Sequence, residues 1–502
     1  MVRCKPELLT ERAKGHLYPV FLIQLAISHI ITACSSFWGV NRSFELWAQF
    51  FAIGTPSLSS IRQWVLRVGL YVLQQPPQRR DDWIWVIDLT LQLGAAKCLV
   101  VLGISQADWH QQVAQGQGCL QHQDMTVLEI EVLFECNGQH IEQRLSQLSE
   151  RVGQPVQIVS DHGSDLKKGI ELYTKPIPGL IHTHDVTHGM ALLLKHTLEP
   201  DEPFQTFLSQ CHQSRQQLQQ TRLAFLSPPA QRSQARYLNL EPLVEWAQVV
   251  LRYYQQGDFS KITPSHQLDK EAFYGLIEHQ LKTPILKQLA ALERKTYDNQ
   301  AQLSQQLMSI LSPEHFEQYG SMICQAADLG RRQFQEKLGW LLDRQSELHQ
   351  YEALVSLVQR ANKQLKQQGL SRHSHLQFAQ DTQQMNLSQP GQAFRAVVID
   401  YIKQQGSPMA ETQPLLASSD VLESLFGKYK LFCQRSPLKE VGPLILTIPL
   451  CTVHLTGSFV KRALESVRAI DVDNWAKEVF GTSMFAQRKA VFGRKEEDTE
   501  VA

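Results

Sequence analysis

The order of the segments between residues 83 and 198 constrains the fold of this chain more than any other feature. Three segments rich in β-branched and aromatic residues predict strands, with a tight turn at Gly94 after the first: 83–93, 96–105 and 126–134. Hydrophobic periodicity then predicts a helix, a strand, a helix, a strand and a helix in turn: 139–153, 154–161, from 164 onward, 179–184 and 185–198. Strands and helices in this order predict an α/β domain with a mixed sheet.

Two carboxylates occupy informative positions in this order. Asp88 lies in the middle of the first strand between apolar residues, where a carboxylate is costly unless it is paired or binds a metal. Asp161 ends a later strand, at the edge where open α/β sheets usually carry their chemistry. If these strands are neighbours, the pair provides oxygen ligands suited to Mg²⁺ or Mn²⁺. The alternatives are capping by backbone amides for Asp88 and an Asx-turn or a helix N-cap for Asp161. Asp165 is a rival, but it falls in the first turn of the next helix, where the helix dipole favours Asp.

A third acidic residue is needed to complete such a site, and the segment 418–430 (SSDVLESLFGKYK) offers Glu423. Helical periodicity places Lys430 on the same face two turns later, so a phosphate-binding ammonium would accompany a metal-binding carboxylate. The alternative is an exposed helical glutamate, which is the commonest fate of this residue type. Three rival carboxylates lie in the same part of the chain: Glu411, Glu440 and Glu465.

The first 80 residues carry nine Lys or Arg against three Glu, although the whole chain is balanced at 49 against 49. This local excess of positive charge favours a polyanionic partner. Residues 42–75 contain a short amphipathic segment, a Gly-Thr-Pro-Ser break and a longer amphipathic segment, which is the outline of a helix-turn-helix. Three side chains would lie on the outward face of its second helix and reach phosphates and base edges: Arg62, Gln63 and Arg67. The alternative is a plain helical hairpin with a solvated basic face.

The remaining composition bounds the class of protein. A chain of 502 residues with 43% hydrophobic content predicts two to four domains with ordinary cores. Its nine Cys include no C-x-x-C pair, which indicates a reducing compartment. Residues 17–40 are apolar enough to suggest a membrane span, but polar residues interrupt the centre and favour a buried helix: Gln24, Ser28 and His29.

Residues 200–395 are rich in Gln, Leu, Glu, Lys and Arg with long helical periodicity, which predicts a helical domain. Within it, Trp246 occupies an apolar helical position, where core packing is favoured over stacking on a flipped base. Before this helical region, the segment HTHDVTHG (182–189) contains four side chains that could form a transition-metal site: His182, His184, Asp185 and His188. Its spacing matches no closed zinc pattern, so capping of a helix by Asp185 is the favoured interpretation.

The pattern formed by Asp88, Asp161, Glu423 and Lys430 resembles the catalytic pattern of insertion-sequence transposases of the DDE class. The ribonuclease H-like core of these enzymes carries Asp, Asp and Glu, and the Glu is often followed by six residues and then Lys. The resemblance covers roughly residues 80–198 and 415–480. It implies that Asp88, Asp161 and Glu423 are the catalytic and metal-binding carboxylates, with Lys430 as the following Lys. Families with the full Tyr, Arg, Glu, Lys signature carry Tyr and Arg where this chain has Leu416 and Ser419.

The expected fold class is α/β, with a ribonuclease H-like mixed sheet interrupted by a large all-α insertion. The expected domains are a helix-turn-helix DNA-binding domain, the first part of the core, the helical insertion, the final part of the core with the catalytic Glu, and a disordered tail: 1–77, 78–199, 200–395, 396–485 and 486–502.

The function that the resemblance implies is a DNA transposase that binds the terminal inverted repeats of its element and cuts and joins DNA strands, using two Mg²⁺ (or Mn²⁺) ions per active site. Its partners would be double-stranded DNA, both end and target, and further copies of the chain assembled on DNA in the bacterial cytoplasm, without a membrane. The side chains expected to contact DNA are Arg62, Gln63, Arg67 and Lys430, with Lys167 and Lys168 as further phosphate contacts. Two rival functions are a ribonuclease H-like nuclease that does not join strands and an inactive, domesticated DNA-binding protein.

Overall fold

The computed structural model describes residues 10–91, 95–116, 118–161, 163–221, 223–230, 240–256, 266–267, 296–297, 305–306, 308–310, 313, 317, 329–408, 414–433 and 440–492. The chain divides into two compact units. The first comprises Met1–Gly189, Ala361–Gln380 and Asp400–Ala502, and the second comprises Met190–Arg360 and Asp381–Ile399.

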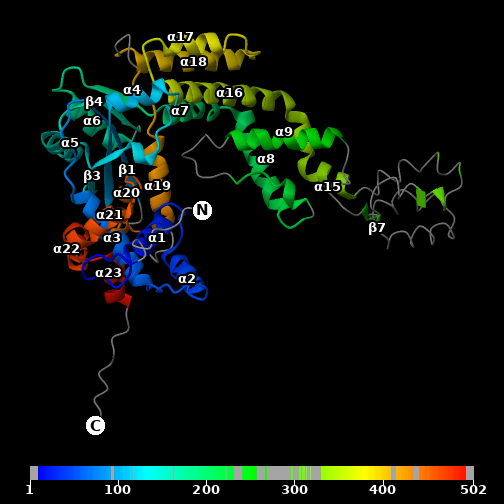
Figure 1. Cartoon of the computed structure of the whole chain (residues 1–502). Helices are drawn as coiled ribbons and strands as arrows, with labels where there is room; N and C mark the ends of the chain where they lie inside the picture. The colour runs from blue at the N-terminus through cyan, green and yellow to red at the C-terminus, as the bar shows by residue number, and fades with distance from the viewer. Residues whose placement is uncertain are drawn as a thin grey trace. The chain divides into compact units, whose positions relative to one another are not determined.

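A five-stranded mixed sheet forms the centre of the first unit (Figure 1). Its strands are β1 (Trp83–Leu91), β2 (Lys97–Ser105), β3 (Thr126–Leu133), β4 (Pro155–Ser160) and β5 (Ile181–His184). They lie in the order β3-β2-β1-β4-β5, antiparallel between β1, β2 and β3 and parallel between β1, β4 and β5. All five predicted strands are present, so the prediction of an α/β protein with a mixed sheet is confirmed. The turn predicted at Gly94 lies outside the described residues.

The helices of the first unit cover both faces of this sheet or pack beyond it. Those before and within the sheet region are α1 (Val20–Ile31), α2 (Phe37–Trp47), α3 (Leu58–Gln74), α4 (Gln106–Ala114), α5 (Gly138–Val152) and α6 (Ser164–Thr174). Those near the C-terminus are α17 (Ser374–Asp381), α19 (Asp420–Cys433), α20 (Thr447–Leu450), α21 (Gly457–Ser466), α22 (Ala469–Phe480) and α23 (Met484–Phe492). Four of the described helices have residues in both units: α17, whose last residue belongs to the second, and α7 (Val186–Leu198), α16 (Gln345–Gln368) and α18 (Gln389–Gly406).

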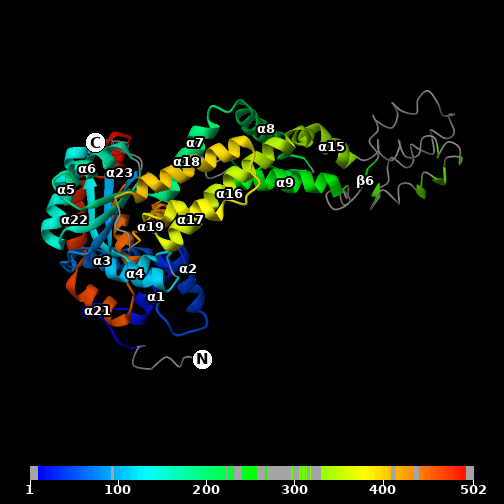
Figure 2. The same cartoon turned by 90° about the horizontal axis from the view of Figure 1, so that it is seen from above.

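Alternate side chains of β1 point to opposite faces of the sheet and pack into two separate hydrophobic cores. Trp85 and Ile87 are buried on one face with apolar side chains of α5 and α6, two helices that lie side by side in Figures 1 and 2. Ile84 and Val86 are buried on the opposite face with apolar side chains of α1, α3 and α19. Because side chains alternate with a period of two, Asp88 faces the same side as Val86, toward the core that contains α19.

Residues 1–77 were predicted to form a domain of their own. In the structure, the N-terminal helices belong to the same unit as the sheet. Apolar residues of α1, α2 and α3 belong to the same core cluster as the sheet. Helix α1 has seven buried residues, as expected for the apolar segment. Among the described residues, no helix combines the length and the apolar character that a membrane crossing requires.

Helix α3 was predicted to be the exposed recognition helix of a helix-turn-helix, but it is buried on more than one face. Its Leu66 and Leu70 pack with Val467 and with α22 in a second apolar cluster. Gly69 approaches the chain so closely that a Cβ atom there would lie 2.1 Å from the carbonyl oxygen of Leu446. Helix α3 therefore joins the N-terminal and C-terminal parts of the unit.

Arg67 shows how this packing changes the predicted DNA-binding face. Its Nε donates to the Val467 carbonyl at 2.6 Å, and its Nη2 donates to the Leu464 carbonyl at 2.5 Å. The guanidinium thus satisfies backbone oxygens at the C-terminal end of α21, and burial lowers the pKa of Arg67. The prediction that Arg67 lies on an outward face is wrong. Arg62 is exposed and Gln63 is half-buried.

Two further differences concern short helices. Helix α4 was not predicted, because its sequence QADWHQQVA contains little apolar periodicity and buries only Trp109. Helix α23 covers part of the tail predicted to be disordered from residue 486 onward. The rest of that tail, 493–502, lies outside the described residues.

The described part of the second unit is mainly helical. It contains α8 (Glu202–Leu218), α9 (Leu240–Gln256), α15 (Leu329–Leu338) and parts of the four shared helices. Its core includes an edge-on contact between Phe204 and Tyr351, with ring centroids 5.2 Å apart. Trp246 is half-buried and its indole N–H donates to the Leu226 carbonyl at 2.9 Å, which is a packing role. The described strands of this unit, β6 (His266–Gln267) and β7 (Thr296–Tyr297), pair only with each other.

Candidate functional site

The parallel pairing of β1, β4 and β5 ends at one level in the first unit, and an aspartate follows the last residue of each strand in this pairing, although β1 itself continues to Leu91 beside β2. Ile87 of β1 is in register with Ser160 of β4, and Ser160 is in register with His184 of β5. Adjacent strands lie about 5 Å apart, so the next residues form a row across this end of the parallel pairing. These residues are Asp88, Asp161 and Asp185. The predicted proximity of the strands that carry Asp88 and Asp161 is confirmed.

The half-buried Asp88 carboxylate lies near other acidic groups. Its Oδ1 accepts a hydrogen bond from the Leu89 N–H at 2.6 Å, so backbone capping of Asp88 is present. Burial, then the charge of Asp161 and, to the smallest extent, the charge of Glu423 raise the pKa of Asp88 to about 7, against the opposing effects of the Leu89 N–H and of His188. A bound cation would stabilise a carboxylate whose charged form is disfavoured in this way.

Asp161 makes the predicted Asx-turn. Its Oδ1 accepts a hydrogen bond from the Gly163 N–H at 2.9 Å, immediately before α6 begins. The rival Asp165 is directed elsewhere, since its Oδ2 lies 2.9 Å from the Lys97 Nζ. Of the two carboxylates in this loop, Asp161 is therefore the one whose charge acts on Asp88.

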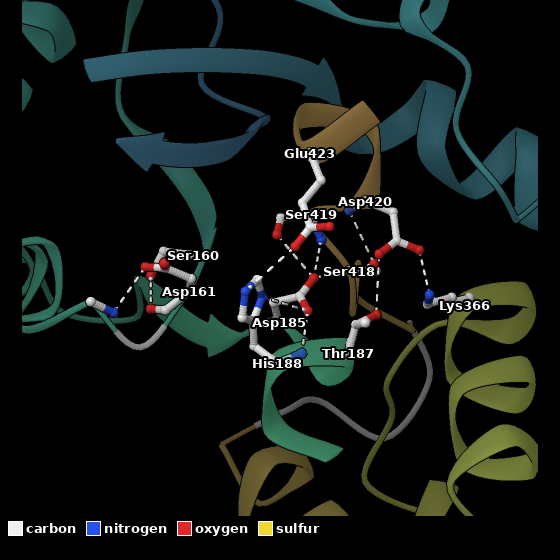
Figure 3. A network of polar contacts seen from close by, with 11 residues as sticks. Ser160, Asp161, Asp185, Thr187, His188, Lys366, Ser418, Ser419, Asp420 and Glu423 are labelled. Atoms are coloured by element: carbon white, nitrogen blue, oxygen red, sulfur yellow. Dashed lines mark hydrogen bonds and ion pairs between the residues drawn. The ribbon is translucent and has the colours of Figure 1, made fainter. Parts of the chain in front are cut away.

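Asp185 is the most buried carboxylate of the row, with 1% of its surface exposed. Its Oδ1 accepts a hydrogen bond from the His188 N–H at 2.8 Å, so the predicted capping of α7 by Asp185 is confirmed. Its Oδ2 accepts from the Ser419 N–H at 2.5 Å and from the Ser419 hydroxyl at 2.9 Å. Figure 3 shows these contacts joining the start of α7 to the start of α19.

His188 connects this carboxylate to Glu423. The imidazole Nδ1 lies 3.3 Å from Asp185 Oδ1, and the Nε2 lies 3.4 Å from Glu423 Oε1. The hydrogen bond to Asp185 raises the pKa of His188 to about 9, so the ring is a cation between two carboxylates at neutral pH. Glu423, in the first turn of α19, has 23% of its side chain exposed, so the alternative of an exposed surface glutamate does not describe it.

The rivals of Glu423 have other partners. Glu440 accepts a hydrogen bond from the Met484 N–H at 2.9 Å, and Glu465 accepts one from the Lys14 N–H at 3.0 Å. Glu411 lies outside the described residues. Lys430 is exposed in the last turn of the helix that carries Glu423.

The predicted phosphate contacts on α6 are on its outer surface. Lys167 Nζ lies 3.9 Å from Glu171 Oε1, and the stem of Lys168 packs over Gly138. In the His-rich segment, the His182 side chain contacts the neighbouring strand β4: its Nε2 lies 2.9 Å from the Ser160 hydroxyl. In the part of the chain that the structure describes, no three His, Cys, Asp or Glu side chains are arranged to hold a metal ion. As they stand, the carboxylates of Asp88, Asp161 and Glu423 interact electrostatically without converging on one point.

Replacing Asp88 with Asn is expected to stabilise the protein at pH 8. The folded-state pKa of Asp88 is raised, so the folded state binds this proton more tightly than the unfolded state, and stability falls as pH rises from about 4 to about 7. Asn keeps the acceptor for Leu89 and removes the charge, so the free energy of unfolding at pH 8 should rise by about 1–3 kcal/mol. Urea unfolding at pH 5 and pH 8 measures this difference.

Asp165→Asn is the matched control for this measurement, because Asp165 is paired with Lys97 and its loss should give no gain at either pH. An Asp88→Asn protein that is no more stable than the wild type at pH 8 would show that the Asp88 charge is not disfavoured in the fold.

The sequence indicated Asp88, Asp161 and Glu423, but it did not indicate the bonds from Asp185 to Ser418 and Ser419. Asp185 and the two serines are 233–234 positions apart, so no local pattern indicates their contact. An Asp at a helix start, followed three residues later by His, was nevertheless a signal for a capping aspartate with an imidazole partner. Comparison of the chain with protein-family models and with curated proteins gives no match.

Proposed function

We propose that this chain is a DNA transposase with a ribonuclease H-like catalytic core, which cuts and joins DNA strands with the help of divalent metal ions. The observation that carries the proposal is the row of carboxylates where the parallel pairing of β1 and β4 ends, with Glu423 from α19 acting on the same half-buried Asp88. The strand order β3-β2-β1-β4-β5 is compatible with such a core.

The donor set fits Mg²⁺ or Mn²⁺ in its chemistry. Asp88, Asp161 and Glu423 provide carboxylate oxygens, which hard divalent cations prefer. Burial first, and then the charges of Asp161 and Glu423, raise the pKa of Asp88, and a divalent cation beside it would stabilise the ionised carboxylate. These three residues would hold the ions, which supply activation of water or a 3′-hydroxyl and stabilisation of the leaving oxygen.

The other side chains of the site would orient the Glu423 carboxylate and bind the DNA backbone. His188 forms an ionic contact with the Glu423 carboxylate that would restrain it. Lys430 lies two turns further along α19 and would act as a point charge for a DNA phosphate. Arg62 is exposed at the start of α3 and is a further candidate for contact with the DNA backbone, whereas Arg67 is occupied by backbone carbonyls.

An assay with labelled DNA tests the proposal. The substrate is duplex DNA that covers the sequences flanking the gene for this chain, incubated with the full chain, Mg²⁺ and a supercoiled plasmid. The expected result is labelled DNA cut at the element end and joined to the plasmid. Cut ends without joined products would instead identify a nuclease, and binding without cutting would identify an inactive DNA-binding protein.

A further inference from the structure

The starts of α7 and α19 are tied together by a single buried carboxylate. Asp185 accepts hydrogen bonds from the first turn of α7 through Oδ1 and from the two residues immediately before α19 through Oδ2. The donors on the α19 side are the Ser418 hydroxyl at 3.2 Å, the Ser419 N–H at 2.5 Å and the Ser419 hydroxyl at 2.9 Å. The free N–H groups of two helix N-termini thus share one acceptor, as in Figure 3.

The carboxylate is ionised in spite of its burial. Burial alone would raise the pKa of Asp185, but the hydrogen bonds from His188 and from the Ser419 backbone lower it to about 2. An Asn in its place has one acceptor oxygen and one donor group, so it could satisfy the donors of only one helix start. The double connection therefore requires Asp.

A second set of contacts runs in the opposite direction between the same two helix starts. Asp420, the first residue of α19, accepts a hydrogen bond from the Thr187 hydroxyl of α7 at 3.1 Å. The same carboxylate forms an ion pair with Lys366. Each helix start thus carries an aspartate that bonds to the other, which fixes the start of α19 relative to the start of α7.

Glu423 lies one turn beyond this junction. Its backbone N–H donates to the Ser419 carbonyl at 3.2 Å, so fixing Ser419 fixes the start of the turn that presents Glu423. His188, held at 3.3 Å by Asp185, is also 3.4 Å from the Glu423 carboxylate. Asp185 consequently acts on Glu423 by two routes, through the backbone of α19 and through the side chain of His188.

We propose that Asp185 is a positioning residue that sets the Glu423 carboxylate in place opposite Asp88 and Asp161. The inference rests on the proposed function, because it assigns Glu423 as a metal ligand. It predicts that loss of the Asp185 charge weakens the contribution of Glu423 to cation binding while the contributions of Asp88 and Asp161 persist. Partners one step removed from a metal typically change metal affinity by about 10–100-fold when mutated.

Backbone cleavage by Fe²⁺ and ascorbate separates the three contributions. In aerated buffer, iron bound in place of Mg²⁺ reduces dissolved O2 to oxygen radicals, with ascorbate returning Fe³⁺ to Fe²⁺, and these radicals cut the chain beside each ligand. The full-length wild type should therefore give fragments that end near Asp88, Asp161 and Glu423. In Asp185→Asn, the cut near Glu423 should fall about tenfold relative to the other two. Asp165→Asn, a carboxylate removed from the Lys97 pair, is the matched control and should cut as the wild type does.

Each outcome decides the inference. An undiminished cut near Glu423 in a folded Asp185→Asn protein would overturn it and leave the proposed function standing. Absence of metal-dependent cuts in the wild type would overturn the proposed function, and the inference with it. If Asp185→Asn does not fold, His188→Gln keeps the backbone bond to Asp185 and removes the ionic contact with Glu423. The cut near Glu423 should then weaken, and an unchanged cut in His188→Gln would overturn the inference.

Discussion

Glu423→Gln is expected to reduce DNA cleavage and strand transfer by about 10³-fold or more, because it removes a charge from the metal-binding set at nearly constant volume. Binding to element ends should be unchanged, since Glu423 is half-buried among His188 and the start of α19 and is not part of a basic DNA-binding surface. Gel-shift and cleavage assays on the same preparation measure the two properties separately.

Glu465→Gln is the control for the Glu423 variant. Glu465 accepts a hydrogen bond from the Lys14 N–H, far in sequence from the carboxylate row, so its loss should leave cleavage within about twofold of the wild type, the range expected for surface substitutions. A Glu423→Gln protein that cleaves and joins DNA at the wild-type rate would remove Glu423 from the site.

Gly69→Ala is expected to destabilise the first unit by about 3 kcal/mol or more, because a methyl group at this position forces the backbone apart. The added Cβ would lie 2.1 Å from the Leu446 carbonyl oxygen and 2.9 Å from its carbonyl carbon. These are backbone atoms, so a rotamer change cannot relieve the clash. Urea unfolding of both proteins, followed by circular dichroism, gives the difference in the free energy of unfolding.

Gly427→Ala in α19 is the matched control. A Cβ there meets nothing within 4 Å, and Ala is favoured over Gly inside a helix by about 0.5–1 kcal/mol. The two Gly→Ala changes should therefore act in opposite directions. Equal effects would show that α3 is not packed against Pro443–Leu446, and would restore the interpretation of α3 as an exposed recognition helix.

The strands could be predicted from the sequence because each is a run of β-branched and aromatic residues, and their order followed once the helices between them were recognised. Periodicity was less informative for α3. It indicated one apolar face, yet Leu66 and Leu70 lie on another face that is covered by residues near the C-terminus. Arg67 was assigned to the surface for the same reason, since its acceptors are carbonyls of a helix about 400 positions away.

In the candidate site, too, local sequence signals were informative and contacts between distant segments were not. Asp88 and Asp161 could be predicted, because a carboxylate in an apolar strand and one at a strand end are local signals. Glu423 was indicated by its spacing to Lys430. The role of Asp185 depended on pairing with Ser418 and Ser419, a contact 233–234 positions apart that a local pattern does not encode.

The most direct test of the proposed two-metal site is anomalous diffraction at the manganese edge, from crystals of the full chain grown with Mn²⁺ and duplex DNA of the gene-flanking sequence. We expect two manganese peaks about 4 Å apart, ligated by the carboxylates of Asp88, Asp161 and Glu423. Manganese found only elsewhere on the chain, or the Glu423 carboxylate more than about 8 Å from both aspartates with DNA bound, would contradict it.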